Sequence, residues 1–273
     1  MATLLFALRL WLARKIYGEL APGLVKIGSR RIIKGPCQES EAEAMEFVRN
    51  NTSIPVPAVF HTHRIESGFY IEMERVKGKN LEHVWNDLSV EQKHQLVNSL
   101  AGYVKELRAL PAPAADLVAS AKQHNKLRDA RVGSTPFGPY STHSDFHSLL
   151  RGHISLDKAS DTFGPNVIEC HVKKYQTLFT HADLSMRNIM VDNGHITAII
   201  GWAFAGWYPE YWEFTKAHYR PCDIPDWYDL LENALARYDD ELEAERVLWS
   251  KLDQPGDQHP PSTARSKAAK PQE

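Results

Sequence analysis

A short polar segment in the second half of the chain has the residue types and spacing that phosphoryl transfer requires. It reads His181-x-Asp183-Leu184-x-x-x-Asn188. In a phosphoryl-transfer site, an Asp beside the attacking hydroxyl accepts its proton, and an Asn five residues later binds a metal ion. An isolated His-x-Asp more often only orders a loop, because the carboxylate accepts hydrogen bonds from nearby backbone amides. The Asp-to-Asn spacing favours a phosphotransfer loop over a simple turn.

The residues that follow predict where a second metal ligand should lie. Asn188 leads into an apolar run at 189–191, a turn at 192–194 that contains Asn-Gly, and a second apolar run at 196–200. Asn-Gly between two such runs is a strong hairpin signal, so the residue after the second run returns beside Asn188. That residue is Gly201, where a second metal-binding carboxylate is expected. Glycine has no side chain with which to bind magnesium.

Composition sets broad bounds on the class of protein. The chain has 273 residues, a length that is enough for one large domain or two lobes. It contains 32 basic and 34 acidic side chains. The near-neutral balance gives no general attraction to nucleic acid or to an anionic membrane. The three cysteines, Cys37, Cys170 and Cys222, are far apart in the sequence. They indicate reduced thiols of a cytoplasmic protein rather than a disulfide framework or a zinc site.

The N-terminal segment allows two interpretations. Residues 4–12 form an apolar run that is interrupted by Arg9 and followed by Arg14 and Lys15. A targeting peptide has this composition, but no small-residue cleavage site follows closely and the run is too short to span a bilayer. We favour an amphipathic helix within residues 1–22 that packs against the protein. Its apolar stripe at helical spacing consists of Leu5, Leu8, Leu12 and Ile16.

The remaining patterns predict a strand-rich first half and a mostly helical second half. The expected elements are a hairpin at 23–34, a helix at 39–50, an extended segment at 54–58, a strand at 69–76 and an amphipathic helix at 91–110. The apolar stripe of the last of these consists of Leu96, Leu100, Val104 and Leu107. This order of elements indicates two lobes with a cleft between them, in an α+β arrangement.

Two later segments are less regular. Residues 112–170 contain glycines and prolines and predict a loop-rich insertion with short helices. Helical patterns return after Thr215. The tail at 253–273 is rich in Pro, Lys and Ser and has almost no apolar residues, which predicts disorder.

Residues 23–219 resemble the aminoglycoside phosphotransferase family of kinase-like proteins, and in particular its fungal branch. The motifs that carry the resemblance are IIKGP at 32–36, SEAEAMEFVRNNTSIPVPAVF at 40–60, and the segment 180–214 with its AGWYPEYWEF ending. The resemblance implies a bilobal protein-kinase-like fold. A small strand-rich N-lobe at 23–77 would bind nucleotide, and a larger helical C-lobe at 78–252 would carry the catalytic loop. It also implies ATP and Mg²⁺, a small-molecule acceptor with a hydroxyl group, and no nucleic-acid partner.

The resemblance also assigns roles to residues of the N-lobe. Lys34 falls at the position of the phosphate-binding lysine, and Glu41 at that of the helix carboxylate that pairs with it. Glu39 and Glu43 are local rivals for this pairing. Residues 73–76, through Glu74 and Val76, fall where the backbone receives the adenine.

In the C-lobe, the resemblance makes Asp183 the catalytic base and Asn188 a metal ligand. His181 and Glu213 are expected to support the catalytic loop without taking part in chemistry. The family typically has Ile-Ile-Asp-Trp-Glu where this chain has Ile200-Gly201-Trp202-Ala203, so both acids are missing. A dependable Gly-rich phosphate loop is also missing from the sequence.

Two functions from different classes remain open. One is an ATP-dependent phosphotransferase that acts on a hydroxyl of a small molecule, which Lys34, Asp183 and Asn188 favour. The other is a pseudokinase that binds a nucleotide, a metabolite or a protein without transferring phosphate, which Gly201 favours. A protein kinase is disfavoured, since Tyr208-Pro209-Glu210 does not have the setting of an activation segment. Acids are scattered through 112–170, so an aminoglycoside acceptor rests on the family name alone.

Overall fold

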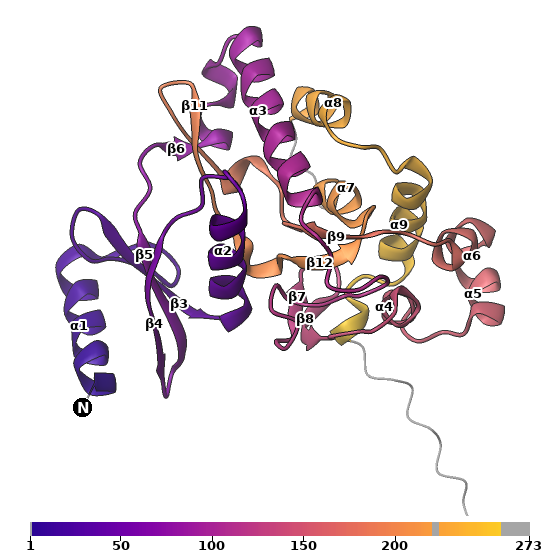
Figure 1. Ribbon diagram of the computed structural model, residues 1–273, viewed down its shortest axis with the longest axis horizontal. Helices are drawn as coiled ribbons and strands as arrows, with labels where there is room; N and C mark the ends of the chain where they lie inside the picture. Colours follow the sequence, from indigo (N-terminus) through magenta and orange to yellow (C-terminus); the bar gives the residue numbers. More distant parts are fainter. Residues whose placement is uncertain (1, 220–223, 258–273) are drawn as a thin grey trace, which may run out of the picture.

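The computed structural model describes residues 2–219 and 224–257 (Figure 1). A strand-rich lobe formed by the first part of the chain lies beside a larger, mostly helical lobe. The predicted α+β arrangement is therefore confirmed.

The N-lobe is built on a five-stranded antiparallel sheet with the order β1-β2-β3-β5-β4. Its strands are β1 (Glu19–Ala21), β2 (Leu24–Lys26), β3 (Arg31–Cys37), β4 (Val59–Ile65) and β5 (Gly68–Glu74). The predicted hairpin is the β2–β3 pair, and Gly28 in its turn has φ of 97°, a conformation that favours glycine.

Helices α1 (Ala2–Tyr17) and α2 (Glu39–Asn51) cover opposite faces of this sheet (Figure 1). Side chains alternate between the two faces of a strand. Ile33 of β3 packs in a cluster with α1, whereas its neighbour Ile32 packs in the cluster that contains α2. The sheet thus separates α1 from the rest of the molecule, while α2 lies between the sheet and the C-lobe.

The N-terminal helix is present, but the predicted packing stripe is wrong. Leu5, Leu8, Leu12 and Ile16 are exposed, and the helix instead buries Phe6, Leu10 and Ala13 against the sheet. The helix is thus rotated about its axis relative to the prediction. Arg9 favours the observed orientation, because its guanidinium donates to both carboxylate oxygens of the buried Glu72 at 2.7 and 3.1 Å. Since the helix is apolar on both sides, its periodicity could not indicate which side is buried.

The long helix of the C-lobe, α3 (Val90–Arg108), matches the sequence prediction. It begins with a capping box in which Ser89 and Gln92 satisfy each other's backbone amides. The whole predicted stripe is buried, and it consists of Leu96, Leu100, Val104 and Leu107.

The remaining elements form the rest of the C-lobe and its small sheets. The helices are α4 (His143–Leu150), α5 (Leu156–Phe163), α6 (Pro165–Val172), α7 (Trp212–Ala217), α8 (Pro225–Ala234) and α9 (Asp239–Lys251). The strands are β6 (Lys79–Asn80), β7 (Leu127–Asp129), β8 (Gly133–Phe137), β9 (Thr177–Thr180), β10 (Ile189–Asp192), β11 (His195–Ile199) and β12 (Gly206–Pro209). Short 3-10 turns are η1 (Leu81–His83), η2 (Trp85–Asp87), η3 (Met186–Asn188), η4 (Trp202–Phe204) and η5 (Pro255–Asp257).

Buried ion pairs hold the insertion to the helices that follow it. The Lys216 ammonium lies 2.7 Å from Asp129, and the Arg131 guanidinium lies 3.1 Å from Glu245, with all four side chains almost fully buried. Removal of one partner from such a pair leaves an uncompensated buried charge, which is strongly destabilising. These pairs therefore fix β7, α7 and α9 relative to one another.

The prediction of disorder from residue 253 onward is wrong for the first part of the tail. Asp257 accepts hydrogen bonds from the backbone amides of Ser134 and Thr135 at 2.7 to 2.9 Å and also from their hydroxyls. These bonds, first of all those from the two amides, lower the pKa of Asp257 to about 2. The rest of the tail and Cys222 lie outside the described residues.

Candidate active site

A buried carboxylate supports the loop between β9 and η3 that carries Asp183. Glu213, in the first turn of α7, accepts hydrogen bonds from the backbone amides of His181 at 2.7 Å and Ala182 at 3.1 Å. Ala182 has φ of 61°, so the chain turns sharply there. Burial raises the pKa of Glu213, and neighbouring groups, among them the hydrogen bonds from the two amides, oppose this rise. Glu213 thus fixes the backbone immediately before Asp183.

The histidine of the motif also holds backbone. Its Nε2 donates to the carbonyl oxygen of Ile200 at 3.0 Å, and its Nδ1 accepts from the amide of Asp183 at 3.2 Å. The ring packs edge-on against Trp202 with centroids 4.6 Å apart. His181 therefore ties the catalytic loop to the end of the hairpin, at the position next to Gly201.

The hairpin places Asn188 and Gly201 side by side, as its sequence predicts. Strand β10 pairs with β11 in a register that puts Ile189 opposite Ile199, and the amide of Ile200 donates to the carbonyl of Asn188 at 2.9 Å. A Cβ atom at Gly201 would lie 2.5 Å from Oδ1 of Asn188. The Asn188 side chain therefore occupies the space into which a side chain at position 201 would project.

Both carboxylate oxygens of Asp183 accept hydrogen bonds. Oδ2 accepts from Nδ2 of Asn188 and Oδ1 accepts from Nη2 of Arg187, each at 2.7 Å. Asn188 Nδ2 also donates to the Asp183 carbonyl at 2.8 Å. Asn80 of β6 donates to the backbone carbonyl of Arg187, which fixes that turn from the opposite side. The Asp183 side chain is held in one orientation and is still 23 % exposed.

Arg187 is a site residue that the sequence analysis missed. The sequence feature that could have indicated it is the spacing of Asp183 and Arg187, four residues apart, because a helical turn brings two such charges together. That signal is common on protein surfaces and usually has little consequence. Its importance here comes from the η3 turn, which places Arg187 and Asn188 on the two oxygens of one carboxylate.

In the N-lobe, the predicted pair of Lys34 and Glu41 is present. The Lys34 ammonium of β3 lies 2.5 Å from Oε1 of Glu41 in α2. The two rivals have other partners, because Glu43 lies 3.0 Å from His124 and Glu39 lies 2.5 Å from Arg64. The second oxygen of Glu41 is buried without a hydrogen-bond partner, so the pair retains an unused acceptor.

A cavity of about 510 Å³ lies between the lobes and joins most of the predicted site. Its polar lining includes the side chains or backbone of Lys34, Glu41, Glu74, Val76, Asn188 and Gly201. Its apolar wall includes Leu24, Ile32, Met73, Met190 and Trp202. The volume lies within the range of small-molecule sites, and the apolar wall with a lysine at one end fits a nucleotide.

Asp183 does not line this cavity but a neighbouring hollow of about 90 Å³. The hollow also includes Glu82, Arg187 and Lys216. Asn188 lines the large cavity and bonds Asp183, so it connects the two spaces. The structure thus places the predicted nucleotide residues in one cavity and Asp183 in a second space, and Asn188 connects the two.

The residues present do not fit a complete magnesium site. Mg²⁺ prefers oxygen ligands in near-octahedral geometry and is usually bound through one or two carboxylates. Here Asp183 already accepts from Arg187 and Asn188, Gly201 has no side chain, and Oδ1 of Asn188 is the remaining side-chain oxygen at this position. Within residues 2–219 and 224–257, no cluster of three or more His, Cys, Asp or Glu side chains could hold a metal ion.

Comparison with known proteins identifies the family of this chain. Residues 36–249 match the phosphotransferase enzyme family. The sequence matches none of the curated proteins with which it was compared.

Solved structures with similar folds include three aminoglycoside phosphotransferases. APH(4)-Ia is 17 % identical with a TM-score of 0.59, over 82 % of this chain and 78 % of that chain. APH(2'')-IIa in complex with gentamicin is 18 % identical with a TM-score of 0.57, over 87 % and 83 %. ADP-bound APH(2'')-Ib is 17 % identical with a TM-score of 0.52, over 82 % and 80 %. The likeness confirms the bilobal, kinase-like fold.

Proposed function

The chain belongs to the phosphotransferase enzyme family, and we propose that it transfers the γ-phosphoryl group of ATP to a hydroxyl of a small molecule. The observation that carries this proposal is the shared centre of the two lobes. Lys34 and Glu41 line the same cavity as Asn188, which bonds Asp183. In this proposal residues 23–77 bind the nucleotide, and residues 78–252 supply the base and bind the acceptor.

The proposed reaction needs positioning more than covalent chemistry from the protein. Glu41 holds Lys34 against the phosphates, and the backbone of Glu74 and Val76 receives the adenine. The acceptor oxygen forms a bond to the γ-phosphorus while the bond from that phosphorus to the ADP oxygen breaks. Asp183 takes the hydroxyl proton as this occurs.

Magnesium is the weakest part of the proposed site. When bound, the ion would neutralise charge on the phosphate oxygens, and Asn188 is the side chain that remains to hold it. We propose that the chain comes from the fungal branch of the family and that Gly201 replaces a metal-binding Asp. The contacts proposed for Lys34 and Glu41 do not depend on the ion, whereas phosphoryl transfer with Asp183 as base does.

A second function is favoured by one specific observation. The Asn188 amide points to Asp183 and fills the space beside Gly201, which suits a protein that binds a nucleotide without transferring phosphate. The two functions are separated by ATP binding with and without Mg²⁺, followed by turnover against a library of hydroxylated metabolites. Transfer to any acceptor supports the enzyme. Binding of ATP without transfer or hydrolysis supports the pseudokinase.

Most charges around Asp183 are paired within the protein. Arg187 is bonded to Asp183 and Lys216 to the buried Asp129, so neither base offers net positive charge to the hollow. The one further acid of the lining, Glu82, is too little charge to attract a polycation, and we propose a hydroxyl compound with few charges as acceptor. We place the reaction in the cytoplasm, where the thiols of Cys37 and Cys170 stay reduced.

Glu41→Gln is expected to raise the KM for ATP by about tenfold, because the carboxylate charge that holds the Lys34 ammonium is lost and a weaker, neutral acceptor remains. The matched control is Glu43→Gln, two residues away on the same helix and paired with His124 instead. Steady-state kinetics with varied ATP measure both variants. Equal effects of the two substitutions would contradict a specific role for Glu41.

Arg187→Gln is expected to lower kcat by about tenfold and to leave the KM for ATP unchanged. The guanidinium holds one oxygen of Asp183 and does not line the nucleotide cavity. Arg187→Lys should restore part of the rate, since an ammonium can reach the same oxygen with fewer donors. A rise in the KM for ATP with an unchanged kcat would show that Arg187 acts on the nucleotide instead.

A further inference from the structure

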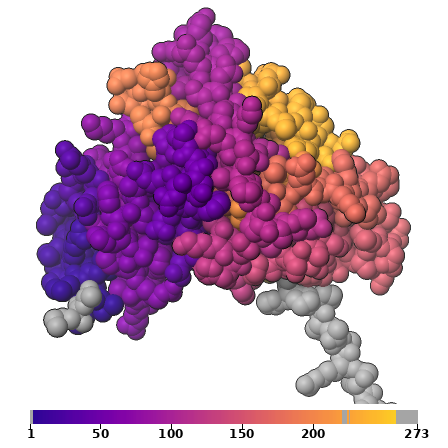
Figure 2. All heavy atoms as spheres, in the orientation of Figure 1, coloured from indigo at the N-terminus to yellow at the C-terminus, as the bar shows by residue number. Residues whose placement is uncertain are grey.

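Helix α1 presents a second apolar face to solvent. The large apolar side chains that it leaves exposed, each by 43 % or more, are Leu4, Leu5, Leu8, Trp11, Leu12, Ile16 and Tyr17. In the space-filling view, α1 forms the outer edge of the N-lobe (Figure 2). Single exposed apolar residues are normal, but a contiguous group on one helix marks an interaction surface.

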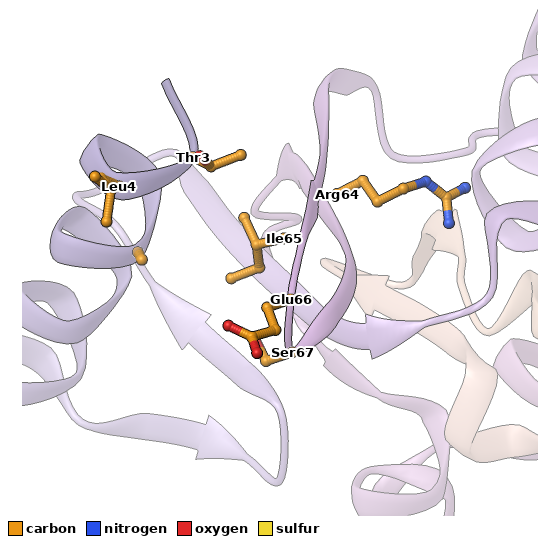
Figure 3. Close-up of a pocket in the computed structure, with 7 residues that line it drawn as sticks. Thr3, Leu4, Arg64, Ile65, Glu66 and Ser67 are labelled. Atoms are coloured by element: carbon orange, nitrogen blue, oxygen red, sulfur yellow. The ribbon is translucent and has the colours of Figure 1, made fainter. Parts of the chain in front are cut away.

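Two hollows beside α1 extend this surface. One of about 560 Å³ lies between the start of the helix and the β4–β5 turn, where it is lined by Leu4, Ala7 and Ile65 (Figure 3). Arg64 points away from the helix at this end. The other hollow, of about 370 Å³, lies between α1 and the β2–β3 turn, where Ile27 faces the exposed stripe. The exposed apolar face of α1 therefore projects between two hollows, and we call this face the ridge.

Basic residues outnumber acidic ones around the ridge. Residues 1–38 contain seven Lys or Arg and one acidic residue, whereas the whole chain has a net charge of −2. One of the seven, Lys34, lines the inter-lobe cavity and does not belong to this surface. Helix α1 contains no acid, and its last turn has Arg14 and Lys15. Lys26 lies near the same end, with its ammonium 5.7 Å from the centre of the Tyr17 ring. Although the chain as a whole is nearly neutral, its N-terminal surface is therefore both basic and apolar.

Nearby acids cancel part of this charge. The buried Glu72 is paired with Arg9 and Arg31, and Glu19 with Arg14 at 2.9 Å, which leaves Lys15, Lys26 and Arg30 as the basic residues in excess. Glu66 lines the hollow at the opposite end of the helix from Lys15.

We propose that α1 is a docking site for the surface of an anionic lipid bilayer. An interfacial helix inserts its apolar face at the boundary of headgroups and acyl chains, while flanking Lys and Arg contact anionic headgroups. Trp11 and Tyr17 suit this boundary, where amphipathic rings are enriched. In the described part of the chain, no helix is both long enough and apolar enough to cross a membrane.

The packing of α1 would present the protein to the bilayer as a rigid body. Phe6, Leu10 and Ala13 fix the helix to the sheet, and Arg9 is bonded to Glu72. The inter-lobe cavity lies beyond the sheet on the side of α2, so a bilayer on α1 leaves it open. This inference does not depend on the proposed reaction.

Flotation of the full chain with lipid vesicles tests the proposal. The vesicles contain phosphatidylcholine alone or phosphatidylcholine mixed with phosphatidylserine. The wild type is expected to float with the anionic vesicles, less at high salt, and to bind neutral vesicles weakly. The double substitution Leu5→Glu and Leu8→Glu should weaken binding on the order of a hundredfold, because two inserted side chains are lost.

The matched control is Val90→Glu with Val172→Glu, at two exposed apolar positions of α3 and α6 that are 65 % and 60 % exposed. This variant should bind as the wild type does, and both variants should melt at the wild-type temperature. Absence of binding by the wild type, or equal loss in both variants, overturns the proposal. So does a dimer that Leu5→Glu and Leu8→Glu dissociate, since a second copy then covers the ridge.

Discussion

Asp183→Asn is expected to lower phosphoryl transfer by about a hundred- to ten-thousandfold and to leave ATP affinity unchanged. The substitution removes the proton acceptor, and loss of a general base has an effect of about this size. Asp183 lies outside the cavity that contains Lys34, so nucleotide contacts are not altered. Single-turnover transfer and equilibrium ATP binding measure the two quantities separately.

The control for this change is Asp192→Asn, at the end of β10, where the side chain is exposed and lines neither the nucleotide cavity nor the acceptor hollow. It should leave both quantities unchanged. An unchanged single-turnover rate in Asp183→Asn would remove Asp183 from the mechanism. The pseudokinase interpretation predicts that wild type and variant share the same absence of transfer and the same ATP affinity.

The arrangement around Asn188 could be predicted because it depends on local geometry. A two-strand hairpin with a short turn brings the outer ends of its strands together, so the sequence alone indicates that Gly201 returns near Asn188. The shift in register between Met190 and Val191 was not predictable in this way. Helix α3 was predictable for a similar reason, since its single apolar stripe allows one buried face.

The partner of Lys34 required the family resemblance in addition to the sequence pattern. Residues two apart on a helix differ by about 200° in direction, so Glu41 faces away from both Glu39 and Glu43. The sequence therefore indicates that the rivals cannot share its face, but not which face is turned to β3. That choice depends on the packing of α2 against the sheet, where Met45 and Val48 are buried.

The two wrong predictions also concern contacts between distant parts of the chain. The rotation of α1 depends on the bond of Arg9 to Glu72, 63 residues away. The order of the first tail residues depends on bonds from Ser134 and Thr135 to Asp257, more than 120 residues away. Local composition does not contain either contact.

Gly201→Asp is expected to raise ATP affinity in the presence of Mg²⁺ by about tenfold or more. Changes in residues that only contact the ligands of a metal already alter metal affinity by about 10- to 100-fold. A carboxylate at position 201 would add a direct oxygen ligand beside Asn188. The change has a steric cost. The new Cβ would lie 2.5 Å from Asn188 Oδ1, and Gly201 has φ of 84°, so Asn188 must rotate away from it.

Gly201→Ala is the matched control, because it adds the same Cβ atom without a carboxylate. Both variants should melt at lower temperature than the wild type, since a left-handed conformation costs a side-chain-bearing residue about 1–2 kcal/mol. Asp tolerates this conformation better than Ala, so the loss should be smaller for Gly201→Asp. Thermal melts measure this shared cost, and it is separate from any gain in nucleotide binding.

The comparison of ATP binding and hydrolysis, with and without Mg²⁺, then separates the two proposed functions. A metal-dependent gain in Gly201→Asp that is absent in Gly201→Ala indicates a phosphotransferase that has lost one ligand and kept the rest of its site. In a long-diverged pseudokinase, the added carboxylate would only repel Asp183 and the phosphates, and ATP affinity would fall more in Gly201→Asp than in Gly201→Ala. No metal dependence in the wild type or in Gly201→Asp would reject the phosphotransferase and leave a nucleotide-binding protein, because Lys34 and the apolar wall of the cavity do not require the ion.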